Sequence, residues 1–105
     1  MSGGRQREAR PHTMLAMVSV EAMPRRDGWE CTVEVADPRG ATRHTVDVSA
    51  RDLARWGRSG EMVAQLVQRA FDFLLARESP SQILRRLQLS DIQRYFPEFD
   101  EEIRR

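Results

Sequence analysis

The stretch from Glu61 to Arg77, EMVAQLVQRAFDFLLAR, limits what this chain can fold into more than any other. At 100° per residue its apolar side chains cover an arc of about 220° around a helix, and the polar ones share the narrow remainder. A helix that rests on one sheet needs an apolar stripe only somewhat wider than about 100°. We therefore expect two neighbours for this helix: a sheet, and either the C-terminal segment or a second subunit.

The chain before this helix predicts a tail followed by three strands. Residues 1–13 are rich in glycine, arginine, serine and proline, which indicates a disordered basic tail, and residues 14–105 are expected to form one domain. A first strand at 15–23 carries apolar residues on both faces, which favours a well-covered or interior position. The second strand, 29–36, alternates apolar and polar side chains, and the third is expected at 41–48.

The turn between the second and third strands sets their register. Asp37-Pro38-Arg39-Gly40 is typical of a type I turn. Matching the apolar faces across it pairs Ala36 with Ala41, so that the opposed pairs are Val35 and Thr42, Val33 and His44, Cys31 and Val46, and Trp29 and Val48. We therefore predict an α+β fold: a small three-stranded antiparallel meander packed against one central helix and closed by short C-terminal helices.

Three serine-led segments predict helix starts. Ser49 is suited to cap a helix over 50–56, and Ser79-Pro80-Ser81-Gln82 has the pattern of a capping box, which predicts a helix over 83–87. Ser90 begins a third, which Pro97 must break or redirect. In this last segment the apolar residues recur at helical spacing and are the natural cover for the second flank of the central helix; they are Ile92, Phe96, Phe99 and Ile103.

Charge and composition restrict the function classes. The net charge is +1; the tail contributes +2, and the remaining 92 residues hold 14 arginines against 15 carboxylates. The folded part therefore lacks the basic excess of a dedicated nucleic-acid binder. No apolar run approaches the roughly 18 residues of a membrane span, and a signal-like run after Met14 is interrupted by Ser19 and Glu21. Since the single cysteine, Cys31, cannot form a disulfide within the chain, we expect a reducing compartment and a cytoplasmic protein. Met14 or Met17 is an alternative to Met1 as the start of the protein.

The C-terminal third resembles a family of short uncharacterised bacterial proteins with a C-terminal LSxIxRYFPE(F/Y) segment. The resemblance rests above all on residues 89–99, LSDIQRYFPEF, with support from residues 73–78, 83–84, the hairpin with Gly40 and His44, and Asp52-Leu53. It extends over most of residues 17–103 and departs from the pattern at Leu87 and Gln88. The resemblance implies the domain boundaries, and it transfers no catalytic residue.

The residues that could support catalysis or cofactor binding are few. Cys31 and His44 share a face in our register, but no third group or oxyanion feature accompanies them, so we predict a buried structural cysteine, a histidine at the core edge and no enzyme activity. The carboxylates of residues 98–102 do not have the spacing of a metal-binding loop and are interpreted as a solvated helical face. The loop of residues 57–60 lacks the Walker pattern, so we expect no cofactor and no metal.

The remaining candidates are surface contacts. Tyr95, Phe96 and Phe99 either all cover the central helix or form, together with Arg94, a partner-binding segment in which Tyr95 is the exposed anchor, because aromatic residues dominate interfaces. We therefore favour a non-enzymatic intracellular protein-interaction or regulatory module, with a homodimer through an open sheet edge or the aromatic segment as one form of it. The alternative is a nucleic-acid-binding accessory protein that uses arginines of the tail and a C-terminal set; they are Arg5, Arg7, Arg10, Arg85, Arg86 and Arg94.

Overall fold

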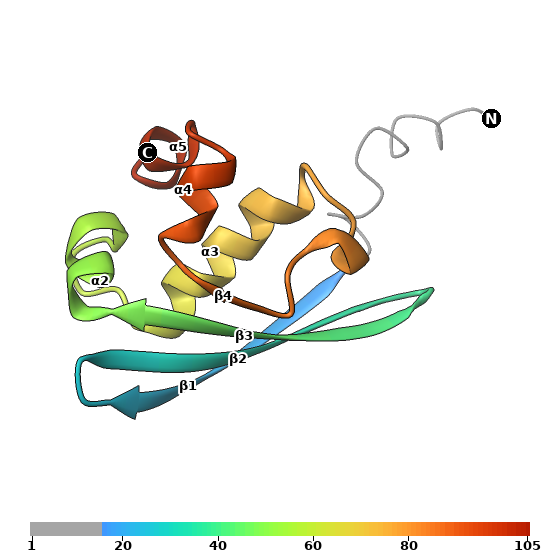
Figure 1. Cartoon of the computed structure of the whole chain (residues 1–105), viewed down its shortest axis with the longest axis horizontal. Helices are drawn as coiled ribbons and strands as arrows, with labels where there is room; N and C mark the ends of the chain where they lie inside the picture. The colour runs from blue at the N-terminus through green and yellow to red at the C-terminus, as the bar shows by residue number, and fades with distance from the viewer. Residues whose placement is uncertain (1–15) are drawn as a thin grey trace.

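The computed structural model describes residues 16–105, in which helices pack on one face of a four-stranded sheet (Figure 1). The predicted tail, residues 1–13, lies outside the described residues. The elements in chain order are β1 (Met17–Arg25), β2 (Gly28–Asp37), β3 (Gly40–Ser49), α2 (Ala50–Trp56), α3 (Val63–Leu75), the 3-10 turn η2 (Pro80–Gln82), β4 (Arg86–Gln88), α4 (Asp91–Tyr95) and α5 (Phe99–Ile103). The predicted α+β class is confirmed.

The two hairpins follow from local turn chemistry. The Asp37 carboxylate accepts a hydrogen bond of 2.9 Å from the Arg39 amide, which stabilises the turn before β3. The predicted register between β2 and β3 is confirmed in every pair. At the start of β2, a side chain on Gly28 would place its Cβ 2.0 Å from the Val48 carbonyl oxygen of β3, so the close approach of β2 and β3 requires glycine there.

The prediction of three antiparallel strands is wrong, because the sheet has a fourth strand and is mixed. The capping box at residues 79–82 forms, with the Gln82 side chain accepting from the Ser79 amide at 2.8 Å, but it starts only one 3-10 turn. The chain then runs along the free edge of β3 as β4, parallel to it. Pairing there satisfies the outer backbone groups of β3 and buries Leu87. The expected helix over 83–87 is therefore absent.

The expected interior position of the first strand is also wrong. The strand order β1-β2-β3-β4 places β1 at an edge, and Met17 and Met23 on its open face are exposed. Its other face, with Val18, Val20 and Ala22, packs against the core. One outward carbonyl of this edge, that of Val18, accepts a hydrogen bond of 2.9 Å from the Gln68 side chain of α3, and Pro24 lacks an amide hydrogen. Both features oppose the addition of another strand.

Helix α3 has the two neighbours that its wide apolar arc predicts (Figure 1). On the sheet side, the Phe71 ring lies 5.5 Å from the ring of His44 in β3. On the opposite flank, the Phe73 ring meets Phe96 and Phe99 edge-on at 5.9 and 5.1 Å. Leu75, at the far edge of the arc, is also buried. The helix is slightly shorter than the expected stretch of residues 61–77: it begins after Met62, whose amide donates to the Gln65 side chain.

The C-terminal segment supplies the second flank, as predicted. Ser49 caps α2 with a complete capping box to Asp52, and Pro97 separates α4 from α5. Ile92, Phe99 and Ile103 are buried in the core, with Phe96 partly buried beside them. The Trp56 indole donates to the Asp100 carboxylate at 2.8 Å and its ring meets Phe99 at 5.2 Å, which attaches the end of α2 to α5.

Replacing Phe99 separates core packing from surface contact. Phe99→Ala should lower the free energy of unfolding by about 3–5 kcal/mol, because it opens a cavity beside α3. Phe99→Leu, a milder variant, should lower it by about 1–2 kcal/mol. Tyr95→Ala, at a mostly exposed side chain, should stay within about 0.5 kcal/mol of the parent. Urea unfolding measures all three, and equal effects for Phe99→Ala and Tyr95→Ala would contradict the assignment of Phe99 to the core.

Candidate functional site

Cys31 and His44 are both fully buried, and each ring nitrogen of His44 bonds a group other than the thiol. Burial, with a smaller contribution from the nearby Asp47 charge, raises the pKa of the Cys31 thiol to about 11. The thiol is therefore protonated at neutral pH and is a poor nucleophile. The interpretation of Cys31 as a buried structural cysteine agrees with this placement.

His44 uses both ring nitrogens to hold the fold together. Nδ1 lies 2.8 Å from the Leu84 carbonyl oxygen and Nε2 lies 2.9 Å from the Thr42 hydroxyl. Because a carbonyl can only accept, the neutral ring carries its hydrogen on Nδ1, and Nε2 accepts from the hydroxyl. Burial lowers the pKa of His44, and the Arg85 charge lowers it further against the opposing effect of the Leu84 bond. His44 thus lies deeper than expected and anchors the segment before β4.

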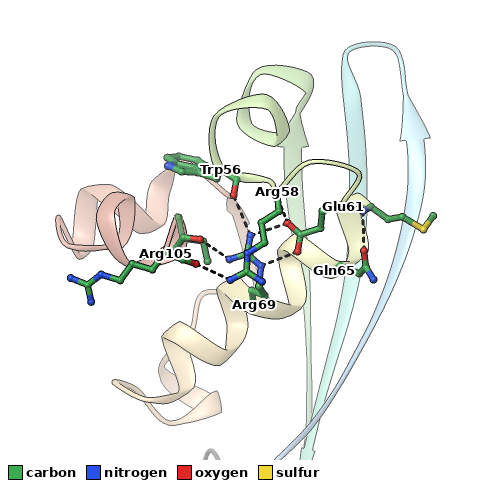
Figure 2. Close-up of polar contacts among 8 residues, drawn as sticks. Trp56, Arg58, Glu61, Gln65, Arg69 and Arg105 are labelled. Carbon is green, nitrogen blue, oxygen red and sulfur yellow. Dashed lines mark hydrogen bonds and ion pairs between the residues drawn. The ribbon is translucent and has the colours of Figure 1, made fainter.

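The backbone of the loop of residues 57–60 already binds a carboxylate of this chain, that of Glu61, as Figure 2 shows. Glu61 accepts from the Arg58 amide at 2.9 Å and forms two bonds of 2.8 Å with the guanidinium of Arg69. Arg69 also donates to the carbonyls of Ile103 and Trp56, at 2.6 and 3.2 Å. The position that an external anion would take before α3 is therefore filled by Glu61.

The acidic residues 98–102 are paired with arginines. Arg77 lies over the Phe73 ring at 3.6 Å and bonds both Glu98 and Glu102, while Asp100 meets Arg55 and Arg104 at 3.2 and 3.0 Å. The Trp56 hydrogen bond is the main cause that lowers the pKa of Asp100. Within residues 16–105, no group of three His, Cys, Asp or Glu side chains is placed to hold a metal ion. None of the helices described there is long and apolar enough to cross a membrane.

The four residues predicted to bind a partner separate into two groups. Phe99 is fully buried and Phe96 is partly buried against Phe73, so these two serve the core. Tyr95 is 66% exposed, and among the described residues its hydroxyl has no hydrogen-bond partner. Arg94 is exposed beside it and reaches only Asp91, at 3.4 Å. Only Tyr95 and Arg94 are thus available on the surface.

Tyr95 lies at an apolar pocket that the sequence did not indicate. The pocket has a volume of about 160 Å³, and its apolar wall comes from the end of α3, the segment before β4, and α4. Leu84 at its rim is 49% exposed. The residues that line it are Leu74, Glu78, Gln82, Ile83, Leu84, Leu87, Ile92, Tyr95 and Phe96. One sequence pattern could have indicated β4, which forms part of the pocket wall: the alternation of polar and apolar residues in Arg86-Leu87-Gln88-Leu89 is typical of a strand, but it is very short.

The arginines proposed for nucleic acid do not form one free basic surface. Arg86 pairs with Asp47 at 3.2 Å and approaches Glu30 at 4.0 Å on the open face of the sheet. Arg94 pairs with Asp91, and Arg85 is exposed without an ion pair among the described residues. Arg5, Arg7 and Arg10 lie outside the described residues.

A scan of protein-family models gives no match to this chain, and neither the curated proteins nor the solved structures contain a significant match. What the chain does must therefore be inferred from the geometry and chemistry of residues 16–105. Within them, exposed apolar groups occur together with an unbonded polar group at the pocket beside Tyr95.

The buried histidine predicts how stability depends on pH. Because the pKa of His44 is lowered in the folded state, its contribution is complete above the unfolded value of about 6.5 and is lost as pH falls toward the folded value. The free energy of unfolding should decrease by up to about 1.4 kcal/mol per pH unit in that window. His44→Gln should lose this slope, and since the carboxylates titrate in both proteins, the difference isolates His44. Identical slopes in urea unfolding between pH 7.5 and 5 would contradict the prediction.

The ion pair between Arg69 and Glu61 should contribute strongly to the free energy of unfolding, because the Glu61 side chain is only 8% exposed. Arg69→Met should lower the free energy of unfolding by about 2–4 kcal/mol, since it leaves a carboxylate largely buried without its cation. The matched control is Arg104→Met, which removes an exposed partner of Asp100 and should cost less than about 1 kcal/mol. A double variant with Glu61→Gln should lose less than the sum of the single effects. Equal losses for the two arginine variants would count against this role.

Proposed function

We propose that this protein is a small non-enzymatic, intracellular protein-interaction module whose binding surface is the apolar pocket beside Tyr95. The observation that carries the proposal is the exposure of Leu84 and Tyr95 around that pocket. Isolated exposed apolar side chains are common on soluble proteins, but here they surround a cavity. Tyrosine, like tryptophan and arginine, is one of the residue types enriched among those that dominate binding energy.

The size of the pocket suits one side chain of a partner. An apolar cavity of about 150 Å³ is large enough for a benzene-sized group, and this pocket measures about 160 Å³. Its walls are rigid, because Ile83, Leu87 and Ile92 belong to the core. The rim residue Leu84 is fixed through its carbonyl by His44. A preformed pocket limits the entropy lost when a partner binds.

The position of Cys31 supports an intracellular setting for this module. Its thiol is fully buried and makes no disulfide. A chain of this size that closes its core without a disulfide suits a reducing compartment. The cytoplasm is therefore the compartment that we propose.

Nucleic-acid binding has weaker support as an alternative. Two of its three C-terminal arginines, Arg86 and Arg94, already pair with carboxylates. The open face of the sheet, which an RNA would use for stacking, carries acidic side chains such as Glu30 and Glu34 and no aromatic ring in the described strands. A homodimer through the β1 edge is also less supported, because Gln68 and Pro24 obstruct that edge.

The test is a selection of random twelve-residue peptides on the immobilised full chain, with parallel selections on Leu84→Asp and on Met17→Asp. Both replaced side chains are exposed, and Met17 lies on the opposite face of the sheet. Peptides selected by the parent should also bind Met17→Asp and should fail on Leu84→Asp. Tyr95→Ala should weaken them about 5–30-fold in titration calorimetry, which corresponds to about 1–2 kcal/mol. Peptides that bind Leu84→Asp equally well would overturn the proposal.

A further inference from the structure

The lining of the pocket contains one charged residue, Glu78. Its amide donates to the Leu74 carbonyl at 2.8 Å, which holds the residue in the turn that follows α3. Its side chain is half-buried, and within residues 16–105 the carboxylate has neither an ion pair nor a hydrogen bond. The acidic residues of the C-terminal segment 91–102, by contrast, each have an arginine partner, as Glu98, Asp100 and Glu102 show.

The neighbouring polar groups do not satisfy this carboxylate. Arg77, the next residue along the chain, is directed to Glu98 and Glu102 and lies over the Phe73 ring. The Gln82 side chain uses its oxygen to accept from Ser79, at both the amide and the hydroxyl. Burial raises the pKa of Glu78, which is the behaviour of a carboxylate that lacks a compensating cation.

We propose that the pocket recognises a peptide segment that inserts one aliphatic or aromatic side chain and places a lysine or arginine against Glu78. The apolar walls fit the first group, and the unpaired carboxylate at the wall fits the second by charge. The unbonded hydroxyl of Tyr95 gives the same cation, or a backbone amide beside it, a further acceptor. Within this site, a cation on the partner relieves a cost that the folded chain alone leaves uncompensated.

This inference rests on the proposed function, and the same peptide selection separates the two. The pocket-dependent peptides should be enriched in a basic residue at a fixed spacing from an apolar one. Glu78→Gln should weaken a selected peptide about tenfold at low salt, and the difference should shrink as salt rises, because a half-buried ion pair is partly screened. The matched control is Glu34→Gln, an exposed acid on the open sheet face, which should leave affinity unchanged.

A second arm replaces the basic residue of the peptide with glutamine. The neutral peptide should bind the parent and Glu78→Gln with equal affinity, because no ion pair is left to lose. Peptides that depend on Leu84 but show no basic residue and no effect of Glu78→Gln would overturn this inference and leave the proposed function intact. If no peptide depends on Leu84, both fall.

Discussion

The requirement that α3 be removed from water on two sides determines most of this structure. Its apolar arc of about 220° exceeds what a sheet can cover. Phe71 faces His44 of the sheet, and Phe73, only two residues on, faces Phe96 and Phe99. The C-terminal helices fold back over this second flank and cover it.

The narrow polar arc of α3 is as important as the wide apolar one. Gln65 bonds the chain before the helix, Gln68 bonds the carbonyl of Val18 in β1, and Arg69 bonds Glu61 and two carbonyls further away. Each of these side chains thus attaches the helix to a different segment. The salt bridge at Arg69 is nearly buried, and its extra bonds to carbonyls compensate the loss of hydration that makes such pairs costly. The polar residues specify the arrangement that apolar burial alone would leave loosely defined.

Local patterns were enough to predict the meander, its register and the cover of α3, because each depends on turn chemistry or on the spacing of apolar residues. They were not enough for β4. At residues 79–82 a genuine capping box indicates a helix. The chain instead forms β4, because the unpaired edge of β3, where Thr45 pairs with Arg86, offers backbone partners from a distant part of the sequence. The pocket depends on the same long-range pairing, which positions Leu84 and Leu87. Tyr95 was a candidate from sequence, but Glu78 was not, because an unpaired carboxylate is recognised only from the absence of neighbours in space.

The pocket lies between the segment that pairs with the free edge of β3 and the C-terminal helices that cover the second flank of α3. After α3 ends, the backbone must cross to the free edge of β3, and it does so through one 3-10 turn and a three-residue strand. These short elements bury Ile83, Leu87 and Leu89, but they are too short to cover Leu84 and Tyr95 as well. Helix α4 ends at Tyr95, and Pro97 prevents its continuation. Exposed apolar area costs about 25 cal/mol per Å² relative to burial, so a segment that covers these residues recovers free energy that the chain cannot gain by itself.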